Sequence, residues 1–447
     1  MSGRFARLAD DGVVAVALSF TDTSGINRVK AVPLAALAAA ADQGVGASPS
    51  FDIFLSDDTM ASGSTISGPD GDLRLIPDLG AIRTIPGQPG WAWAPVDRYF
   101  QNGTPYPACH RLFLADMIKR ADAQQLAIQT GIELEFRLFA ETPTGYEPAS
   151  SAPAYSMGQL LDVGDFATDL LESLDGAGLR VAQFHPEAAH GQFEVSLAPS
   201  DPMTTADTNV LLRHGIRSVA ARHSLAASFS PVPVLDEAGN GGHVHLSLSS
   251  RETGNVFAGG TGPYGMQEAG QQFIAGILEN LVPLTAVLNP APVSYLRLRP
   301  SRWADAFATW GLEAREAAVR FISAPSAEYG AHANIEIKSP DLAASPYLAI
   351  GCLIAAGLDG VARKAGLASP VQGDPGTFSA EELRNRDIRR LPQNLDAATD
   401  AFRLSHLLAG ALGATLFDAI VAVRRGEQVR CRRLDPAEIV DQSRWIY

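Results

Sequence analysis

Acidic residues and histidines alternate with apolar residues in four short segments of the chain. Residues 133–135 and 243–245 each carry two such side chains two positions apart, and Glu194 and Glu336 each stand between apolar neighbours. Successive side chains of a β-strand point to opposite faces, so each segment sends its acids or imidazoles to the face opposite its apolar residues. Several acids on one concave surface repel one another unless a divalent cation neutralises them. The spacing therefore predicts a cation site on one face of a sheet.

A further acid fits the same surface. Glu187 and Glu194 flank a glycine-containing turn, and a hairpin would bring them together. The glycine-rich residues 239–242 ahead of the two histidines let the backbone approach a ligand closely. Taken singly, each acidic segment also fits an ordinary solvent-exposed strand, and each histidine fits a surface or core position.

Carboxylates with an imidazole and no thiolate favour Mg²⁺ or Mn²⁺ over zinc. Proteins commonly hold such cations for phosphoryl transfer, in which arginines bind the phosphate oxygens. Arginines are concentrated in residues 297–320, although each of them alone also fits a surface role. The chain lacks the phosphate-binding loop Gly-x-x-x-x-Gly-Lys-Ser/Thr, the His-Glu-x-x-His zinc motif and the Gly-x-Ser-x-Gly nucleophile motif.

The elements that must position these residues divide into two parts. Residues 1–104 read as short strands and turns, and residues 105–447 mix strands with helices, which predicts an α+β fold. The helices are expected at residues 112–126, 166–177, 204–223, 266–287, 346–364 and 399–423.

Composition narrows the class of protein. With 447 residues, 46% of them hydrophobic, the chain can bury one large core or two unequal ones. The longest apolar run, residues 347–358, is shorter than the roughly 20 residues of a spanning helix, and no signal peptide is recognised, so we expect no membrane partner and a cytoplasmic location. The net charge of −14 disfavours nucleic acid, and three scattered cysteines disfavour a disulfide framework.

Five motifs in order, spread over most of the chain, resemble the glutamine synthetase family. They occupy residues 131–136, 185–194, 241–247, 294–300 and 334–349. The resemblance implies a small N-terminal β-grasp domain and a large catalytic domain with a curved antiparallel sheet. It also implies stacked hexameric rings, with each active site shared between subunits, and ATP-dependent ligation of glutamate through a γ-glutamyl phosphate.

The resemblance also assigns roles to individual residues. It implies one cation held by Glu135, Glu187 and Glu194, and a second held by Glu133, His243 and Glu336. Further implied contacts are His245 and Ser247 with the nucleotide, Arg315 and Arg320 with phosphate, Arg297 with the glutamate carboxylate and Gly239 with the glutamate amino group. Arg297, Arg315 and Lys338 are the candidate catalytic residues.

The departures from the family pattern concern ammonia. Trp303 stands where ammonia-using members have a flap glutamate, and residues 51–54 replace an Asp-Gly-Ser-Ser loop that helps to bind ammonium, leaving Asp52 as the one acid there. Ala238 replaces an asparagine at the glutamate amino group, and Asn334 and Lys338 replace arginines. No tyrosine lies between residues 348 and 446, so the tyrosine adenylylation of regulated members is predicted absent.

We therefore expect a glutamate–amine ligase that resembles γ-glutamylpolyamine synthetases and takes an amine larger than ammonia, such as a polyamine, ethanolamine or an alkyl- or arylamine. Trp303 would contribute to substrate binding because its ring offers a face to alkyl carbon or to a cation. Glu187 and Asp52 are the candidate bases for the amine. The alternatives are a glutamine synthetase that uses ammonia and a binding or structural paralogue without catalysis.

Overall fold

Two β-sheets organise the chain in a computed structural model that describes residues 7–143, 145–300, 306–324 and 332–447. The N-terminal sheet has the strand order β2-β1-β6-β4-β3, with β5 paired to β6. Only β1 and β6 run parallel among its pairs. Its strands are β1 (Ala15–Thr21), β2 (Asn27–Pro33), β3 (Val45–Ala47), β4 (Leu73–Pro77), β5 (Arg83–Thr84) and β6 (Trp91–Phe100).

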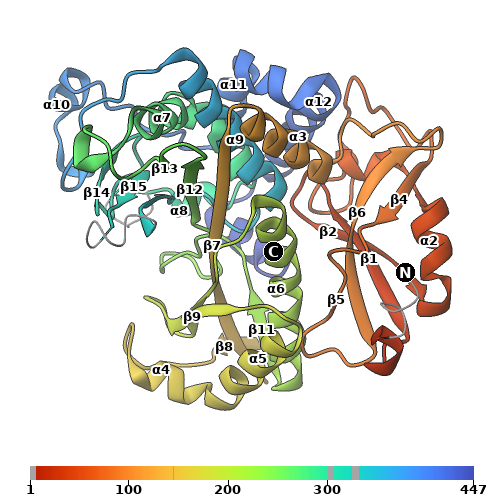
Figure 1. The fold of residues 1–447 in the computed structure, drawn as a ribbon. Helices are drawn as coiled ribbons and strands as arrows, with labels where there is room; N and C mark the ends of the chain where they lie inside the picture. Colours follow the sequence, from red (N-terminus) through yellow and green to blue (C-terminus); the bar gives the residue numbers. More distant parts are fainter. Residues whose placement is uncertain (1–6, 144, 301–305, 325–331) are drawn as a thin grey trace.

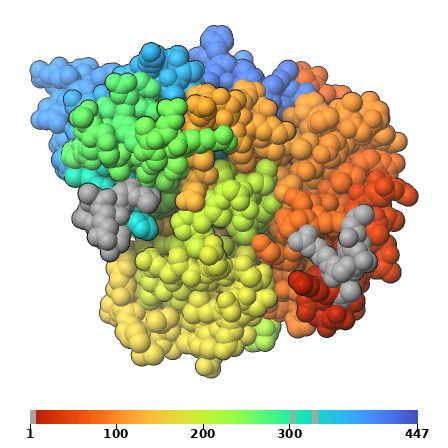
Figure 2. Space-filling model, viewed as in Figure 1, coloured from red at the N-terminus to blue at the C-terminus, as the bar shows by residue number. Residues whose placement is uncertain are grey.

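A separate small core lies in the N-terminal part. Leu18, Leu75 and Ala94 from three of its strands are fully buried there, together with Leu37 of helix α2 (Leu37–Gln43). A mixed sheet covered by one helix agrees with the β-grasp arrangement expected from the resemblance. This part, red to orange in Figures 1 and 2, occupies one side of the molecule. The exact division after residue 104 stays a prediction.

The second sheet is larger and is built around one long strand. β7 (Leu126–Thr142) pairs with β10 on one side and β12 on the other, in the order β14-β15-β16-β12-β7-β10-β9. β8 and β11 pair with the C-terminal part of β7, and β13 pairs with β12. Figure 1 shows β7 running through the middle of this part. The other strands are β8 (Gly145–Pro148), β9 (Val181–Pro186), β10 (Gln192–Leu197), β11 (Leu225–Ser228), β12 (Val244–Ser250), β13 (Gly254–Asn255), β14 (Trp310–Leu312), β15 (Val319–Ile322) and β16 (Asn334–Ile337).

Helices enclose this sheet, and five of the six that the sequence predicts are present. The five are α3, α5, α6, α7 and α9. The helices of this part are α3 (His110–Ala123), α4 (Met157–Asp162), α5 (Gly164–Gly176), α6 (Pro202–Arg222), α7 (Glu268–Leu288), α8 (Ser294–Arg297), α9 (Pro346–Arg363), α10 (Ala380–Asn385), α11 (Leu395–Arg403), α12 (His406–Cys431) and α13 (Pro436–Ser443). The single helix expected at 399–423 is wrong: α11 ends at Arg403, and Ser405 caps α12 by accepting a hydrogen bond from the Leu408 amide.

Three helices of the described chain are long and apolar enough to cross a membrane, which the sequence analysis did not foresee. They are α7, α9 and α12, and buried residues make up 67%, 78% and 39% of their most apolar windows. Phe273 and Leu281 of α7 and Leu353 of α9 belong to the main core. Burial against other helices therefore accounts for the apolar residues of α7 and α9, as in a large interior.

Candidate active site

Strand pairing brings the alternating acids together. Glu135 on β7 is directly opposite Glu194 on β10, and His245 on β12 is directly opposite Glu336 on β16. The amides of Glu133 and Glu135 also donate to the carbonyls of His243 and Gly241. Because like charges opposed across a sheet destabilise it, the register itself requires a neutralising partner.

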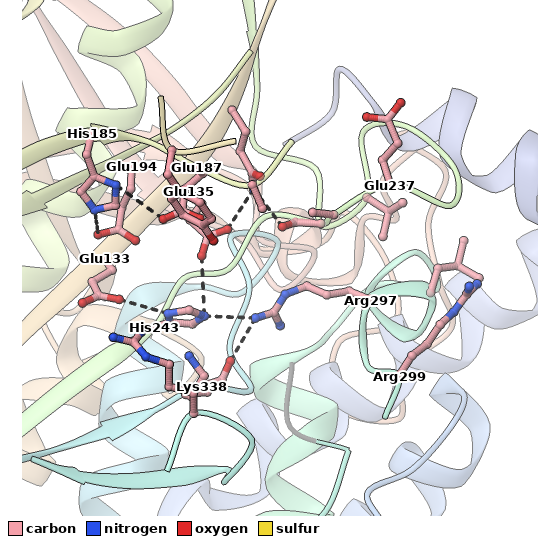
Figure 3. A pocket seen from close by; sticks show the side chains of 18 of the residues that line it. Glu133, Glu135, His185, Glu187, Glu194, Glu237, His243, Arg297, Arg299 and Lys338 are labelled. Atoms are coloured by element: carbon pink, nitrogen blue, oxygen red, sulfur yellow. Dashed lines mark hydrogen bonds and ion pairs between the residues drawn. The ribbon is translucent and has the colours of Figure 1, made fainter. Parts of the chain in front are cut away.

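These side chains line a cavity of about 620 Å³. Figure 3 shows acids on one wall and Arg297 and Arg299 on another. Among the predicted site residues, the lining includes Glu133, Glu135, Glu187, Glu194, Gly239, His243, Arg297, Arg315, Arg320, Glu336 and Lys338. His245 and Ser247 lie on β12 and are not among the residues that line the cavity. His245 Nε2 is nevertheless 3.0 Å from Glu133 Oε1. Trp303 lies outside the described residues.

One group of candidate ligand atoms combines His185, Glu187 and Glu194, within 4.8 Å of one another. The hairpin of β9 and β10 places Glu187 just after β9 and Glu194 on β10, as the sequence predicts. Burial, together with the charges of Glu135 and Glu194, raises the pKa of Glu187 to about 7. A hydrogen bond to Glu194 outweighs burial and raises the pKa of His185 to about 9.

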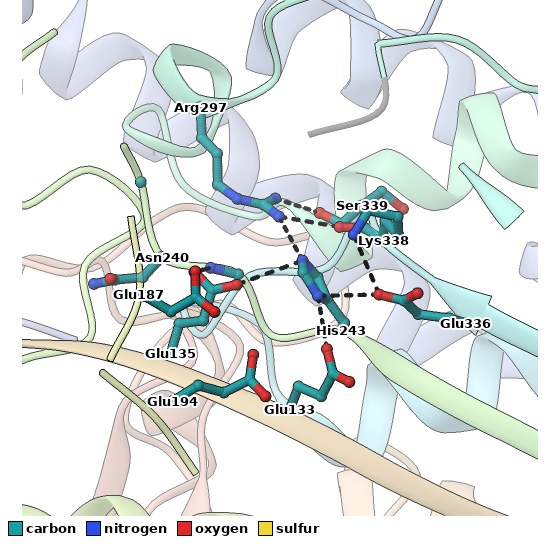
Figure 4. A network of polar contacts seen from close by, with 12 residues as sticks. Glu133, Glu135, Glu187, Glu194, Asn240, His243, Arg297, Glu336, Lys338 and Ser339 are labelled. Atoms are coloured by element: carbon teal, nitrogen blue, oxygen red, sulfur yellow. Dashed lines mark hydrogen bonds and ion pairs between the residues drawn. The ribbon is translucent and has the colours of Figure 1, made fainter. Parts of the chain in front are cut away.

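The other group combines Glu133, His245 and Glu336. His243 adjoins it, with Nδ1 at 3.1 Å from Glu133 and 3.2 Å from Glu336 (Figure 4). Burial opposes a charged His243, but hydrogen bonds to the two carboxylates raise its pKa to about 9. Burial likewise opposes ionisation of Glu133, and the two histidines nevertheless lower the pKa of its carboxyl.

Both groups fit hard divalent cations. The donor set consists of carboxylate oxygens and imidazole nitrogens without thiolate, and burial together with the charges of Glu135 and Glu194 raises the pKa of Glu187. An imidazole that ligates a cation must be neutral, so a cation bound at His243 would replace the proton that the raised pKa favours. The described residues therefore include two groups of side chains that could each hold a divalent cation.

The basic side chains of the cavity are held in place by the protein itself. Arg297 donates to the carbonyls of Ser339 and Lys338, both at 3.0 Å, and its other close neighbour is His243 Nε2 at 3.3 Å. Arg320 binds Glu336 and Glu313, and Lys338 Nζ lies 3.2 Å from Glu336. These contacts aim positive charge at the cavity before any ligand arrives.

Gln192, Tyr155, Asp236 and Glu237 line the cavity but were not singled out from the sequence. Gln192 could have been found, because it precedes Glu194 by two positions on β10 and so shares its face. Tyr155, Asp236 and Glu237 lie in loops, where no periodic pattern points to a cavity.

The structure does not support the prediction that Asp52 is a candidate base for the amine. Its carboxylate is fully buried in the N-terminal part, and both of its oxygens accept from Arg98 Nη1, at 2.9 and 2.8 Å. The neighbouring Phe51 and Phe54 rings pack against each other at 5.2 Å. Asp52 is not among the residues that line the cavity, and its carboxylate is fully buried, so it is not placed to take a proton from an amine there.

Comparison with known proteins shows the family of the chain. Residues 107–439 match the family described as glutamine synthetase, catalytic domain, and the chain belongs to the glutamine synthetase family. As a member of this family it is an ATP-dependent carbon–nitrogen ligase acting on glutamate and an amine.

Within the family, the chain is 45% identical over 443 residues to gamma-glutamylpolyamine synthetase GlnA3 of Streptomyces coelicolor, covering 98% of this chain and 95% of that protein. It is 31% identical to the glutamine synthetase of Halobacterium salinarum, with 93% and 90% covered. Among solved structures, a novel glutamine synthase homolog superposes with a TM-score of 0.87 at 29% identity, covering 97% and 99% of the two chains. The ADP complex of GmaS does so with 0.82 at 27% identity, covering 97% of each chain.

Proposed function

We propose that the acceptor of this ligase is an amine larger than ammonia, of the polyamine, ethanolamine or alkyl- and arylamine class. The observation that carries the proposal is the burial of Asp52 against Arg98, which withdraws the one acid of residues 51–54 from any ammonium site. The 45% identity to a gamma-glutamylpolyamine synthetase supports the same class.

The proposal assigns the cavity residues as follows. Glu135, Glu187 and Glu194 would hold one cation, with His185 beside it, and Glu133, His243 and Glu336 the second, with His245 beside it. The cations supply charge neutralisation at phosphate oxygens when bound. His245 and Ser247 would contact the nucleotide, Arg315 and Arg320 the phosphates, Arg297 and Gly239 the glutamate, and Trp303 the amine.

The reaction then proceeds in two displacements. An oxygen of glutamate's γ-carboxylate attacks the γ-phosphorus of ATP, the bond to ADP breaks, and a γ-glutamyl phosphate forms. The amine nitrogen attacks the γ-carbon, phosphate leaves, and the amide forms while the nitrogen gives up a proton. With Asp52 excluded, Glu187 is the remaining candidate base, since it lines the cavity. Arg315, Arg320 and Lys338 face the cavity where charge would develop on the phosphoryl group.

An amine panel tests the acceptor. The enzyme is assayed with ATP, Mg²⁺ and glutamate against ammonia, ethanolamine, putrescine, spermidine and aniline, with products identified by mass. We expect at least one of the larger amines to give a higher kcat/KM than ammonia. Glutamine as the fastest product would overturn the proposal. The ring assembly, the shared active sites and the cytoplasmic location expected from the resemblance belong to the same proposal.

A further inference from the structure

Gln192 is one of the residues that line the cavity and is buried, with 1% of its surface exposed. Its Oε1 accepts from the Ala189 amide at 2.9 Å, which fixes the orientation of its side-chain amide. Its Nε2 then faces three acceptors: Glu135 Oε2 at 3.0 Å, the Gly239 carbonyl at 2.9 Å and Asn240 Oδ1 at 3.0 Å. One amide group therefore meets a candidate cation ligand and the candidate glutamate loop together.

The partners of Gln192 are themselves held in one orientation. Asn240 donates to the carbonyls of Ser228 and Ser230, so its Oδ1 must point at Gln192. Glu135 Oε2 has a second donor in the Gly241 amide at 2.9 Å, and Glu135 and Asn240 lie close together in Figure 4. The side-chain amides of Gln192 and Asn240 cannot turn over without losing these hydrogen bonds, because each is held by a backbone group that fixes the positions of its oxygen and nitrogen.

Gly239 links the network to the glutamate side of the cavity. A Cβ on this residue would collide with the Pro231 carbonyl and would lie 3.2 Å from Arg297 Cγ. Gly239, whose carbonyl Gln192 binds, thus packs against the aliphatic part of the Arg297 side chain, whose guanidinium is proposed to hold the glutamate carboxylate. Movement of Gln192 would shift Glu135 and the Gly239 carbonyl at once.

We propose that Gln192 is a positioning residue. Its side-chain amide binds both Glu135 and the Gly239 carbonyl and so fixes the cation site and the glutamate site relative to each other. The proposal rests on the proposed roles of Glu135 and Gly239. Partners of this kind around metal ligands change metal affinity by roughly 10- to 100-fold when removed. Because the same amide holds Gly239, the loss should appear in glutamate binding as well.

The test compares two isosteric changes. Gln192→Met keeps the volume and removes both donors. Gln159→Met is the matched control, because Gln159 is also fully buried and braces the same turn, donating to the Glu187 carbonyl at 3.1 Å and accepting from the Gly191 amide at 2.9 Å, but has no bond to Glu135 or to Gly239. Thermal unfolding, calorimetric Mn²⁺ titration without substrates, and kcat and KM for glutamate and for ATP are measured for each protein.

We expect Q192M to weaken Mn²⁺ binding and to raise KM for glutamate by about 10-fold each, with KM for ATP within about twofold of wild type. Q159M should lower the melting temperature without this paired loss. Equal behaviour of the two variants, or a change in only one of the two constants, overturns the proposal. If Q192M does not fold, Gln192→Asn is measured instead, since its shorter amide stays polar but cannot span all partners, and the same paired loss is required.

The Mn²⁺ titration involves no amine. A ligase that prefers ammonia would therefore overturn the proposed acceptor and leave the result for Gln192 intact.

Discussion

At the scale of single residues, the buried Asp52–Arg98 ion pair contributes to the stability of the fold and not to the reaction. Arg98 is 1% exposed and also donates to the Ala108 carbonyl. Removing one partner of a buried ion pair leaves the other charge without compensation, so Asp52→Asn should lower the free energy of unfolding by about 3 kcal/mol. Chemical denaturation measures the loss, and the ratio of rates with spermidine and ammonia should stay unchanged.

Asp57→Asn is the control for that prediction, because Asp57 belongs to the same loop and is exposed. It should change the free energy of unfolding by less than about 0.5 kcal/mol. An Asp52→Asn enzyme that keeps full stability but loses turnover with amines would contradict the structural role.

The cation ligands could be predicted from the sequence because strand alternation is a local property. Glu133 and Glu135 share a face whatever the rest of the chain does. Gln192 and Asp52 show why the rest could not be predicted. Their hydrogen-bond partners, Gly239 and Arg98, lie 47 and 46 residues away in the sequence, and no local sequence pattern predicts contacts over that separation.

At the scale of elements, the turn between β1 and β2 is fitted to the loop that follows β16. Gly25 has a φ of +83°, and a Cβ there would collide with the carbonyl oxygen of Ala343. That loop also contains Ser339, whose carbonyl accepts from Arg297. The turn of the N-terminal sheet thus supports a segment of the candidate active site.

Gly25→Ala should therefore cost about 2–3 kcal/mol of stability and reduce turnover, since the loop must move to admit the methyl group. Gly12→Ala is the matched control: its φ is +77°, but no atom lies within 4 Å of the added Cβ, so only the backbone strain of about 1 kcal/mol applies. Denaturation and steady-state kinetics are compared for both. Equal losses would show that the contact with Ala343 is not required.

The boundaries of elements were harder to predict than their existence. The apolar spacing of residues 399–423 continues through Leu404 and Ser405, although Leu404 is 80% exposed and Ser405 begins a new helix. The spacing of apolar residues alone cannot predict the break between α11 and α12, because a serine that caps a helix and a serine inside a helix are the same residue in the sequence. The mixed N-terminal sheet was easier, since glycine and proline separate its strands in the sequence.

At the scale of the whole molecule, a half-buried histidine lies between the N-terminal sheet and the larger part. His214 on α6 lies with Nε2 at 3.0 Å from Asn27 Oδ1 on β2. Burial, with the charges of Arg213 and Arg217, lowers the pKa of His214 to about 3. The interface therefore holds a neutral imidazole over the physiological range.

This histidine should make stability depend on pH. Below about pH 6.5 the imidazole of His214 is protonated in the unfolded chain, whereas in the folded protein it stays neutral down to about pH 3. The free energy of unfolding therefore falls as the pH is lowered. Between pH 7 and pH 5 the contribution is about 1–2 kcal/mol. His214→Gln should reduce the pH dependence of unfolding by that amount, whereas His406→Gln, an exposed position at the start of α12, should not. An unchanged slope in H214Q would contradict the assignment.

Arg424 of α12 extends the contact between the two parts across almost the entire chain. Its Nη1 donates to the carbonyl of Thr23, 401 residues earlier, and its Nε donates to the carbonyl of Ala286. On a ribosome that adds roughly 5–20 residues per second, the turn at Thr23 emerges roughly 20–80 s before its partner is made. The Thr23 carbonyl therefore cannot receive this hydrogen bond until α12 has been made, and the contact between the two parts through Arg424 forms only after that point.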